Sequence, residues 1–461
     1  MTQIDSFGCE VTLDSAAALD QWNAMMRAFL AHSAKTQEHL SSVLTDAPNF
    51  ALAHAFQGIS YLTLGRRELI ANSQAALANA KEAVAQVGCS TREAQYIQAL
   101  EAWLQGHPAK AAGIMDAILV DAPRDAMALK LGHAIRFILG DAKGMRQSIE
   151  KVLGAYDESH AATGYVLGCH AFAAEELGDY ELAEHQGRRG LDMASDDAWG
   201  LHAVAHVYDM TGQATAGAGW LGGQSERWAH CNNFGFHVWW HLALFLLSIG
   251  ATDEVLDLYD QKIRAEHTDD YRDISNAASM LVRLEIEGIS VGQRWEELAD
   301  LSEKRAKDGC VVFADLHYIM PLARIGRTTA AETLLETLTA SAMKGDCDMS
   351  RVAKISGVPA AQGILAYYQG NYRDAYRQLV AVRPSMQSVG GSHAQRDVFE
   401  RLTIDAALRG DLMDEAKQLL TDRDKNRGAS DAFSTARLQS STTEGTSRTR
   451  IAPPVVSPLP A

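Results

Sequence analysis

Residues 177–183 read LGDYELA, residues 369–375 read QGNYRDA and residues 409–416 read RGDLMDEA. In each stretch an apolar helical pattern stops at a glycine, and an alanine follows five or six residues later. Glycine readily adopts the left-handed conformation that ends a helix, and alanine lets a second helix approach the first closely. Each stretch therefore predicts two helices joined by a tight turn.

The same setting recurs along most of the chain, at intervals of 34 to 44 residues. The glycines that end an apolar pattern are Gly65, Gly106, Gly140, Gly178, Gly212, Gly250, Gly288, Gly326, Gly370 and Gly410. A period of about 34 residues with a glycine between two helices is typical of tetratricopeptide repeats. One pair cannot bury its apolar face alone, so the pairs must stack. The sequence predicts an all-α fold, an α-α superhelix (solenoid) of about ten tetratricopeptide-like helix pairs over residues 14–423.

The two ends of the chain differ from this pattern. Residues 1–13 form an N-terminal extension ahead of the first repeat. Residues 440–461 are rich in serine, threonine and proline, and the chain ends IAPPVVSPLPA. Such a composition does not support a packed core, so residues 424–461 are predicted to be a disordered tail.

The chain has 461 residues, 58 of them acidic and 42 basic, for a net charge of −16. Such acidity disfavours binding to nucleic acid or to an anionic membrane, so neither is an expected partner. The N-terminus lacks the basic and apolar regions of a secretory signal, and the most apolar stretch, 238–249, is shorter than the about 20 residues of a membrane span. The six cysteines stand singly. A cytoplasmic protein with free thiols is expected.

Histidines gather in one region. Of the 16 in the chain, five lie between residues 202 and 241, namely His202, His206, His230, His237 and His241. His202 and His206 are four residues apart, as are His237 and His241, so each pair lies on one helix face. The two helices are the first helices of successive repeats and should lie side by side.

The repeat register predicts which way these side chains point. With the turn glycine at position 15 of a repeat, His202 and His206 take positions 5 and 9, and His237 and His241 take positions 2 and 6. These positions face the concave groove of a tetratricopeptide superhelix. Counted in the same way, Asp209, His317, Arg401 and Asp397 also take groove positions, and Asp315 lies close to His317.

Four imidazoles on two facing helices can bind one cation. The candidate metal ligands are His202, His206, His237 and His241, with Asp209 to complete the shell or orient a ring. Nitrogen ligands with a carboxylate suit zinc, iron, nickel or manganese, so the expected cofactor is one divalent transition metal such as zinc. Two alternatives stay open: histidine and aspartate could act as general base and orienting group without a metal, or form a polar groove that contacts a peptide.

Residues 390–397 read GGSHAQRD and predict a helix start in which Ser392 and Gln395 form a capping box. The same helix start, with Arg396 and Arg401, could hold an anionic group. Trp239 and Trp240 stand beside the second histidine pair, where aromatic rings either pack or form a wall for a substrate. The sequence has no phosphate-binding loop, dinucleotide fingerprint or zinc-protease motif.

Several blocks resemble the tetratricopeptide repeat protein 38 family. They are residues 197–212, Trp228, residues 237–244 (HVWWHLAL), residues 256–260, residues 315–317 and residues 390–397. The resemblance covers most of residues 20–423 and is densest over 177–260 and 313–410. It implies a cytosolic α-solenoid of divergent tetratricopeptide units, and it implies little about chemistry.

Two functions fit these observations. In the first, the groove forms a closed pocket that binds or acts on a small molecule, with metal-assisted hydrolysis or lyase chemistry as its most concrete version. The candidate catalytic residues are Asp315, His317, His393 and Asp397, and the candidate substrate-binding residues are Trp239, Trp240, Arg396 and Arg401. In the second, the protein is a non-catalytic scaffold that binds a peptide or protein in an open groove.

A pocket enzyme should have its groove plugged by segments between repeats, such as 213–233 or 264–276. Groove positions that carry lysine, arginine or asparagine in peptide-binding repeats carry histidine and aspartate here, which favours the first function. The sequence alone does not decide whether the protein is an enzyme, and it does not give the oligomeric state.

Overall fold

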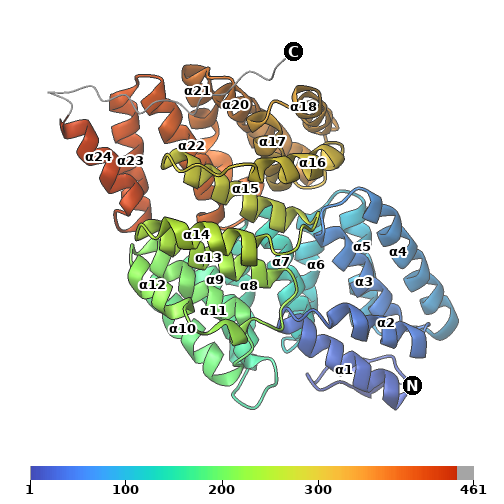
Figure 1. Cartoon of the computed structure of the whole chain (residues 1–461). Coiled ribbons are helices and arrows are strands. Elements are labelled where there is room, and N and C mark those ends of the chain that lie inside the picture. Colours follow the sequence, from blue (N-terminus) through green and yellow to red (C-terminus); the bar gives the residue numbers. More distant parts are fainter. Residues whose placement is uncertain (1, 444–461) are drawn as a thin grey trace.

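The computed structural model describes residues 2–443, and almost all of them belong to paired helices (Figure 1). Neighbouring pairs stack side by side into a superhelix, which confirms the predicted fold class. Within the described residues the paired strands are those of a short hairpin, β1 (Gln3–Ile4) and β2 (Glu10–Val11). Among the described helices, none combines the length and the apolar character needed to cross a membrane.

The N-terminal part of the superhelix contains five helix pairs and one short helical turn. Their bounds are α1 (Ala16–Leu30), α2 (Thr36–Asp46), α3 (Ala51–Thr63), α4 (Glu68–Val87), α5 (Thr91–Leu104), α6 (Pro108–Asp121), α7 (Ala126–Leu139), α8 (Ala142–Val152), η1 (Leu153–Ala155), α9 (Thr163–Glu175) and α10 (Tyr180–Met193). The first helix of each later pair is buried on nearly all sides. In α9, for instance, every residue is buried, because the helix packs between its own partner α10 and the neighbouring pairs.

The central pairs carry the histidines. Their bounds are α11 (Ala198–Met210), α12 (Ala214–Leu221), η2 (Ser225–Arg227), α13 (Phe234–Ser248), α14 (Thr252–Leu258), η3 (Tyr259–Ile263), α15 (Tyr271–Ile286) and α16 (Arg294–Arg305). Helix α13 contacts both α11 and α15. The first helices of three successive repeats therefore lie next to one another.

The C-terminal part completes the superhelix. Its bounds are α17 (Val312–Arg324), α18 (Thr328–Met343), α19 (Asp348–Val352), η4 (Ala353–Gly357), α20 (Val358–Tyr368), α21 (Tyr372–Val382), η5 (Arg383–Val389), α22 (His393–Arg409), α23 (Met413–Arg427) and α24 (Ala432–Thr443). Counted over residues 2–443, the helix pairs number eleven, one more than the sequence pattern indicated.

The extra pair is α1–α2, and its turn explains why the pattern missed it. The left-handed residue of that turn is His32, with φ 56°, where nine of the ten other turns use glycine. Nine of the ten predicted glycines do adopt a positive φ. Gly410 does not, because the following residue, Asp411, takes the left-handed conformation with φ 54°.

The predicted boundary of a disordered tail at residue 424 is wrong for residues 424–443. Helix α23 continues to Arg427, and α24 packs on the end of the superhelix. Phe433 is buried there, with the guanidinium carbons of Arg401 and Arg437 4.3 and 3.8 Å from its ring centre. These contacts between the arginines and the ring stabilise the segment, although its composition is polar. Residues 444–461 lie outside the described part.

The N-terminal extension is packed too. Phe7, Val11 and Leu13 are buried in the same core as α1. The Thr12 amide donates a 2.8 Å hydrogen bond to Glu93 on α5.

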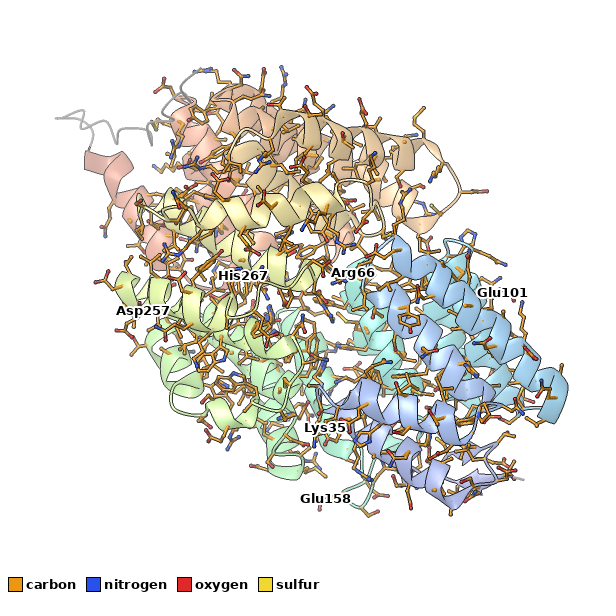
Figure 2. The ribbon with its side chains drawn as sticks, turned by 45° about the vertical axis from the view of Figure 1, so that its right-hand side comes forward. Lys35, Arg66, Glu101, Glu158, Asp257 and His267 are labelled. Atoms are coloured by element: carbon orange, nitrogen blue, oxygen red, sulfur yellow. The ribbon has the colours of Figure 1, made fainter. Side chains whose placement is uncertain are left out.

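The superhelix closes on itself, because two segments between repeats reach back to the N-terminal helices. In the first, which follows α12, the Asn232 amide donates a 2.8 Å bond to the His32 carbonyl. In the second, which follows η3, Asp269 lies 2.6 Å from Arg66, and His267 and Arg66 mark this junction in Figure 2. Both segments fall within the stretches expected to plug a closed groove.

A third closure contact brings the end of α7 against the loop before α22. Gly140, with φ 66°, sits so close to this loop that a Cβ atom would lie 1.8 Å from the Gln387 carbonyl oxygen. Gly288, with φ 78°, has a similar conformation but no atom within 4 Å of such a Cβ. Replacing Gly288 by alanine therefore measures the cost of a left-handed side chain alone. Replacing Gly140 measures that cost together with the cost of moving the segment that packs against it.

We predict that Gly288→Ala lowers the free energy of unfolding by about 1 kcal/mol, the cost of a left-handed alanine. Gly140→Ala should lower it by about 3 kcal/mol or more, because the loop before α22 must also move away. Urea unfolding followed by circular dichroism measures both changes. Equal losses in the two variants would contradict the close approach of α7 to this loop.

Candidate functional site

The structure brings four of the predicted metal ligands together. We call them the histidine cluster: His202 and His206 from α11, and His237 and His241 from α13. One ring nitrogen from each lies within 4.8 Å of all the others. The Nε2 atoms of His206 and His202 are 2.8 Å apart, those of His202 and His237 are 3.1 Å apart, and those of His237 and His241 are 3.2 Å apart.

The cluster lies inside the protein. His202, His206 and His241 are at most 1% exposed, whereas His237 keeps part of its surface exposed. Aromatic rings wall it on two sides. Phe172 of α9 stacks on His202 with ring centres 5.6 Å apart, and Trp240 stacks on His237 at 5.2 Å.

Two of the rings have an oxygen close to Nδ1, and one of these oxygens forms a hydrogen bond. His237 Nδ1 lies 2.8 Å from the amide oxygen of Asn276 on α15. His206 Nδ1 lies 3.2 Å from a carboxylate oxygen of Glu175 at the end of α9. The Asn276 oxygen is an acceptor and requires N–H at Nδ1 of His237, so this neutral ring carries its lone pair at Nε2. This lone pair of His237 then points into the cluster.

Burial governs the charge of the cluster. It lowers the pKa of His202 and His241 well below the usual value and that of His237 to about 3. Burial acts in the same direction on His206, but the carboxylates of Glu175, Glu176 and Asp209 together outweigh it and raise the pKa of His206. Three rings are therefore neutral at pH 7, which is the form that binds metals.

Glu175 is the most unusual group near the cluster. It is 0% exposed, and both of its carboxylate oxygens lack a hydrogen-bond partner among the described residues. A buried carboxylate without hydrogen bonds is costly unless a cation compensates it. Its contact with His206 places this carboxylate directly behind the cluster.

Asp209 was expected to join the metal ligands, and the structure places it elsewhere. Its carboxylate lies 3.0 Å from the guanidinium of Arg427, which comes from α23. Asp209 is not among the groups whose ligand atoms converge. The arginine lies in the segment expected to be disordered, which is why this pairing was missed.

The candidate acid–base residues Asp315 and His317 lie on α17 with partners of their own. His317 Nδ1 bonds the Phe313 carbonyl at 2.8 Å, and its ring packs 5.2 Å from that of Phe399. Asp315 is 3% exposed, and burial, aided by the charge of Asp308, raises its pKa to about 8. Neither belongs to the groups that converge around the histidine cluster.

Trp239 and Trp240 point in different directions. Trp240 is 0% exposed and lines the cluster. Trp239 points away and packs edge-on against Trp228 at 5.1 Å, with the Lys262 ammonium 5.3 Å from its ring centre. Consecutive residues on a helix face directions about 100° apart, so only one of them can reach the histidines.

The remaining candidates lie around α22. The predicted capping box of Ser392 and Gln395 is present. His393 and Arg396 both bond Glu176, with Arg396 at 3.1 Å. Asp397 bonds Arg401 at 2.6 Å, and Arg401 also reaches Asp431 at 3.4 Å, beneath α24.

Glu175 and Glu176 connect these two groups. One carboxylate oxygen from each and a ring nitrogen of His206 lie within 4.8 Å of one another. Glu175 faces the histidine cluster, whereas Glu176 faces His393 and Arg396. Counted back from Gly178 as position 15, the two glutamates take positions 12 and 13. These positions face the groove, so the repeat register could have predicted them. Asn276 takes position 3, which is not one of the groove positions, so the register could not have predicted it.

No family model matches the chain. Among solved structures, the human IFIT1 dimer with PPP-AAAA is 13% identical, with 95% of this chain and 96% of that chain covered and a TM-score of 0.43. The P58(IPK) TPR domain is 11% identical, with 77% and 100% covered and a TM-score of 0.22. Likeness at this level assigns no ligand or activity to the present chain.

We predict that Asp315 makes stability depend on pH. Folding raises its pKa from 3.8 to about 8, so the folded state keeps a proton that the unfolded state releases above about pH 4. This residue therefore reduces stability as pH rises from about 4 to 8. Asp315→Asn, which mimics the protonated acid, should raise the free energy of unfolding at pH 8 by more than about 1 kcal/mol and change it little at pH 4.

Urea unfolding at both pH values tests this expectation. A variant that is destabilised equally at pH 4 and pH 8 would show that the Asp315 carboxyl is ionised in the folded protein.

Proposed function

We propose that the histidine cluster binds one divalent transition-metal ion and that this ion is central to what the protein does. The convergence of four Nε2 atoms, one of them with its lone pair fixed by the hydrogen bond of His237 to Asn276, carries the proposal. In a tetrahedral zinc site with Zn–N of about 2.0–2.1 Å, the nitrogens stand about 3.3 Å apart. Three of the six separations, 2.8 to 3.2 Å, are close to this value, and the other three lie within 4.8 Å.

The surroundings support a cation at this place. Histidine ligands in metal sites usually donate their other N–H to a carboxylate or a carbonyl group, which fixes the ring and raises its basicity. His237 has the Asn276 amide oxygen in that role, and a Glu175 carboxylate oxygen lies 3.2 Å from His206 Nδ1. A bound cation would also compensate the buried charge of Glu175.

The donor set narrows the choice of metal. Four imidazoles suit zinc, iron, nickel or copper. Manganese, which favours carboxylate and water oxygens, fits less well, since Asp209 is paired with Arg427 rather than with the cluster. We keep zinc as the first expectation.

Metal-assisted hydrolysis or lyase chemistry on a small molecule is the catalytic version of this proposal. It requires a coordination position that substrate or water can occupy. Four histidines fill a tetrahedral shell, so catalysis at this cluster needs a metal with more than four positions, such as iron or nickel.

The same closed shell favours a second candidate function. A metal with four protein ligands and no open position is typical of structural sites. The ion would then fasten α11 to α13 in a non-catalytic scaffold, and the superhelix would bind a peptide or protein partner through other surfaces. The number of metal ligands other than histidine distinguishes the two candidates.

Membership of the tetratricopeptide repeat protein 38 family is part of the proposal. The blocks that carry the resemblance include both histidine pairs and the start of α22. If the relationship holds, the histidine cluster is a feature that related chains should share.

We predict that protein purified without a histidine tag contains about one transition-metal ion per chain, and that His202→Ala combined with His241→Ala removes it, because two of four ligands are lost. Elemental mass spectrometry measures the content. The control is His185→Ala combined with His267→Ala, which removes two exposed histidines and should leave the metal in place.

A folded wild-type protein that takes up no zinc, iron, nickel or copper, even after incubation with each ion, would overturn the metal proposal. Circular dichroism must show that the double variant keeps its helices, since buried histidines also contribute to packing.

Two substitutions of Asn276, which bonds the ligand His237, should weaken metal binding to different degrees. Asn276→Leu removes the acceptor for His237 Nδ1 and should weaken metal binding by about 10- to 100-fold, whereas Asn276→Asp keeps an oxygen there and should weaken it less. Competition with a chelator of known affinity gives both values. Equal affinities in the wild type and Asn276→Leu would show that Asn276 does not orient the ring.

A further inference from the structure

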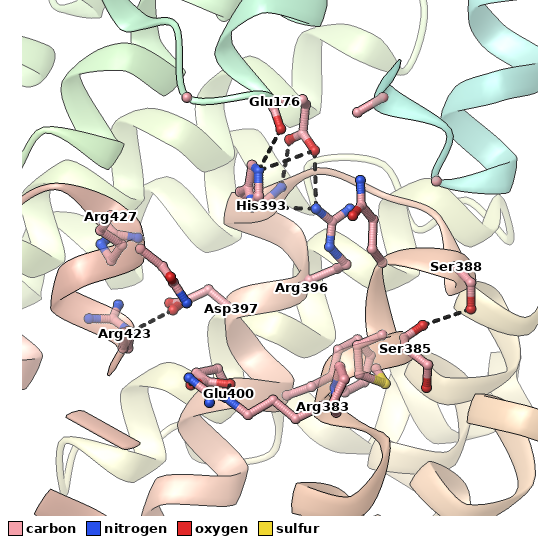
Figure 3. Close-up of a pocket in the computed structure, with 18 of the residues that line it drawn as sticks. Glu176, Arg383, Ser385, Ser388, His393, Arg396, Asp397, Glu400, Arg423 and Arg427 are labelled. Carbon is pink, nitrogen blue, oxygen red and sulfur yellow. Dashed lines mark hydrogen bonds and ion pairs between the residues drawn. The ribbon is translucent and has the colours of Figure 1, made fainter. Parts of the chain in front are cut away.

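A large cavity lies beside the histidine cluster but is distinct from it. It has a volume of about 1120 Å³ and is bounded by the ends of α7 and α9, the starts of α8 and α10, and the elements η5, α22 and α23 (Figure 3). The closure of the superhelix creates this space, because its walls come from repeats more than 200 residues apart, such as Glu176 and Arg396. We call it the arginine cavity. None of the four clustered histidines lines it.

The acidic groups in the walls are already engaged. The lining carboxylates are Asp141, Glu176, Asp397 and Glu400. Each lies between 2.6 and 3.5 Å from a guanidinium nitrogen. Figure 3 shows Glu176 bonded to His393 and Arg396 at one side of the cavity. No carboxylate of the lining is left without a cation.

The basic groups, in contrast, have donors to spare. Arg427 is 5% exposed, and its Nε lacks a hydrogen-bond partner among the described residues. One of its terminal nitrogens contacts only the sulfur of Met210, at 3.7 Å, which is a weak acceptor. Lys143, in the first turn of α8, is exposed and forms no ion pair or hydrogen bond with the described residues.

The lining therefore contains unused donors and no unused acidic acceptor. Its cationic side chains number five (Lys143, Arg383, Arg396, Arg423 and Arg427) against four carboxylates. Three of these arginines also pair with aspartates outside the lining: Arg383 with Asp422, Arg423 with Asp431 and Arg427 with Asp209. The unused donors therefore belong to Arg427 and Lys143. Guanidinium and ammonium groups recognise carboxylate and phosphate oxygens through charge-assisted hydrogen bonds.

We propose that the arginine cavity binds a small molecule that carries an oxyanion, a carboxylate or a phosphate, with Arg427 and Lys143 as its contacts. A carboxylate and a phosphate both present oxygen acceptors to the unused N–H donors of Arg427 and Lys143. The proposal does not require a metal in the histidine cluster. Glu176 lies between the two sites and is the second carboxylate close to His206. A ligand in the arginine cavity would therefore lie near the histidine cluster.

The test measures binding of three probes to the full chain by isothermal titration calorimetry at low ionic strength, where screening is weak. The probes are succinate, inorganic phosphate and putrescine, the last matching succinate in length with the opposite charge. We expect succinate, phosphate or both to bind and putrescine not to bind. Preference between the two anions identifies the oxyanion as carboxylate or phosphate.

Two charge reversals on the same helix locate the site. Lys143→Glu should weaken anion binding by about fivefold or more, because it turns an attraction into a repulsion. Lys151→Glu, an equal change at the exposed far end of α8 and outside the cavity lining, should leave the affinity unchanged.

Neither reversal removes a contact within the described residues, so both variants are expected to fold. Anions that bind no better than putrescine, or equal effects of the two reversals, would overturn the proposal. A metal-free but anion-binding protein would overturn the proposed function and leave this inference standing.

Discussion

Four imidazole nitrogens held against one another in the interior of the protein are the constraint on which the candidate site depends. Neighbouring Nε2 atoms stand 2.8 to 3.2 Å apart, and three of the four residues are almost fully buried. Nitrogens that carry lone pairs repel one another at such distances unless protons or a cation lie between them. The proposed metal would resolve this conflict with all four rings neutral, and the Glu175 carboxylate lies behind them.

The closure of the superhelix makes this interior possible. Segments that follow α12 and η3 reach the N-terminal helices, and the loop before α22 meets the end of α7. These contacts join repeats that lie far apart in the sequence. The same closure brings α9 and α22 together, which places Glu176 against His393 and Arg396 and encloses the arginine cavity.

Much of the fold was predictable because glycine marks most of the turns between paired helices. The exceptions are physical: His32 and Asp411 adopt the left-handed conformation in place of glycine, and contacts of Phe433 and Arg427 order a segment whose composition indicates disorder. Both histidine pairs were predicted from helical spacing and repeat register. Asn276 could not be, since its role depends on the proximity of α13 and α15, and no local pattern encodes that contact.

The candidate acid–base residues show the limit of the register rule. Position in a repeat indicates whether a side chain points inward, but not which inward-pointing groups meet. Asp209 meets Arg427 from a repeat far along the chain, and Asp397 meets Arg423. His317 packs on Phe399 instead of joining the histidine cluster. Long-range closure decides these partners, and closure depends on the sum of small rotations between repeats.

X-ray absorption spectroscopy at the metal edge of the purified, untagged protein tests the central claim most directly. The account predicts the scattering pattern of four imidazoles, with nitrogens about 2.0–2.1 Å from a zinc ion. Additional oxygen ligands around iron or nickel would indicate an open, catalytic position. A metal bound mainly by oxygen or sulfur, or a spectrum unchanged when His202 and His241 are replaced, would contradict the assignment of the histidine cluster as the metal site.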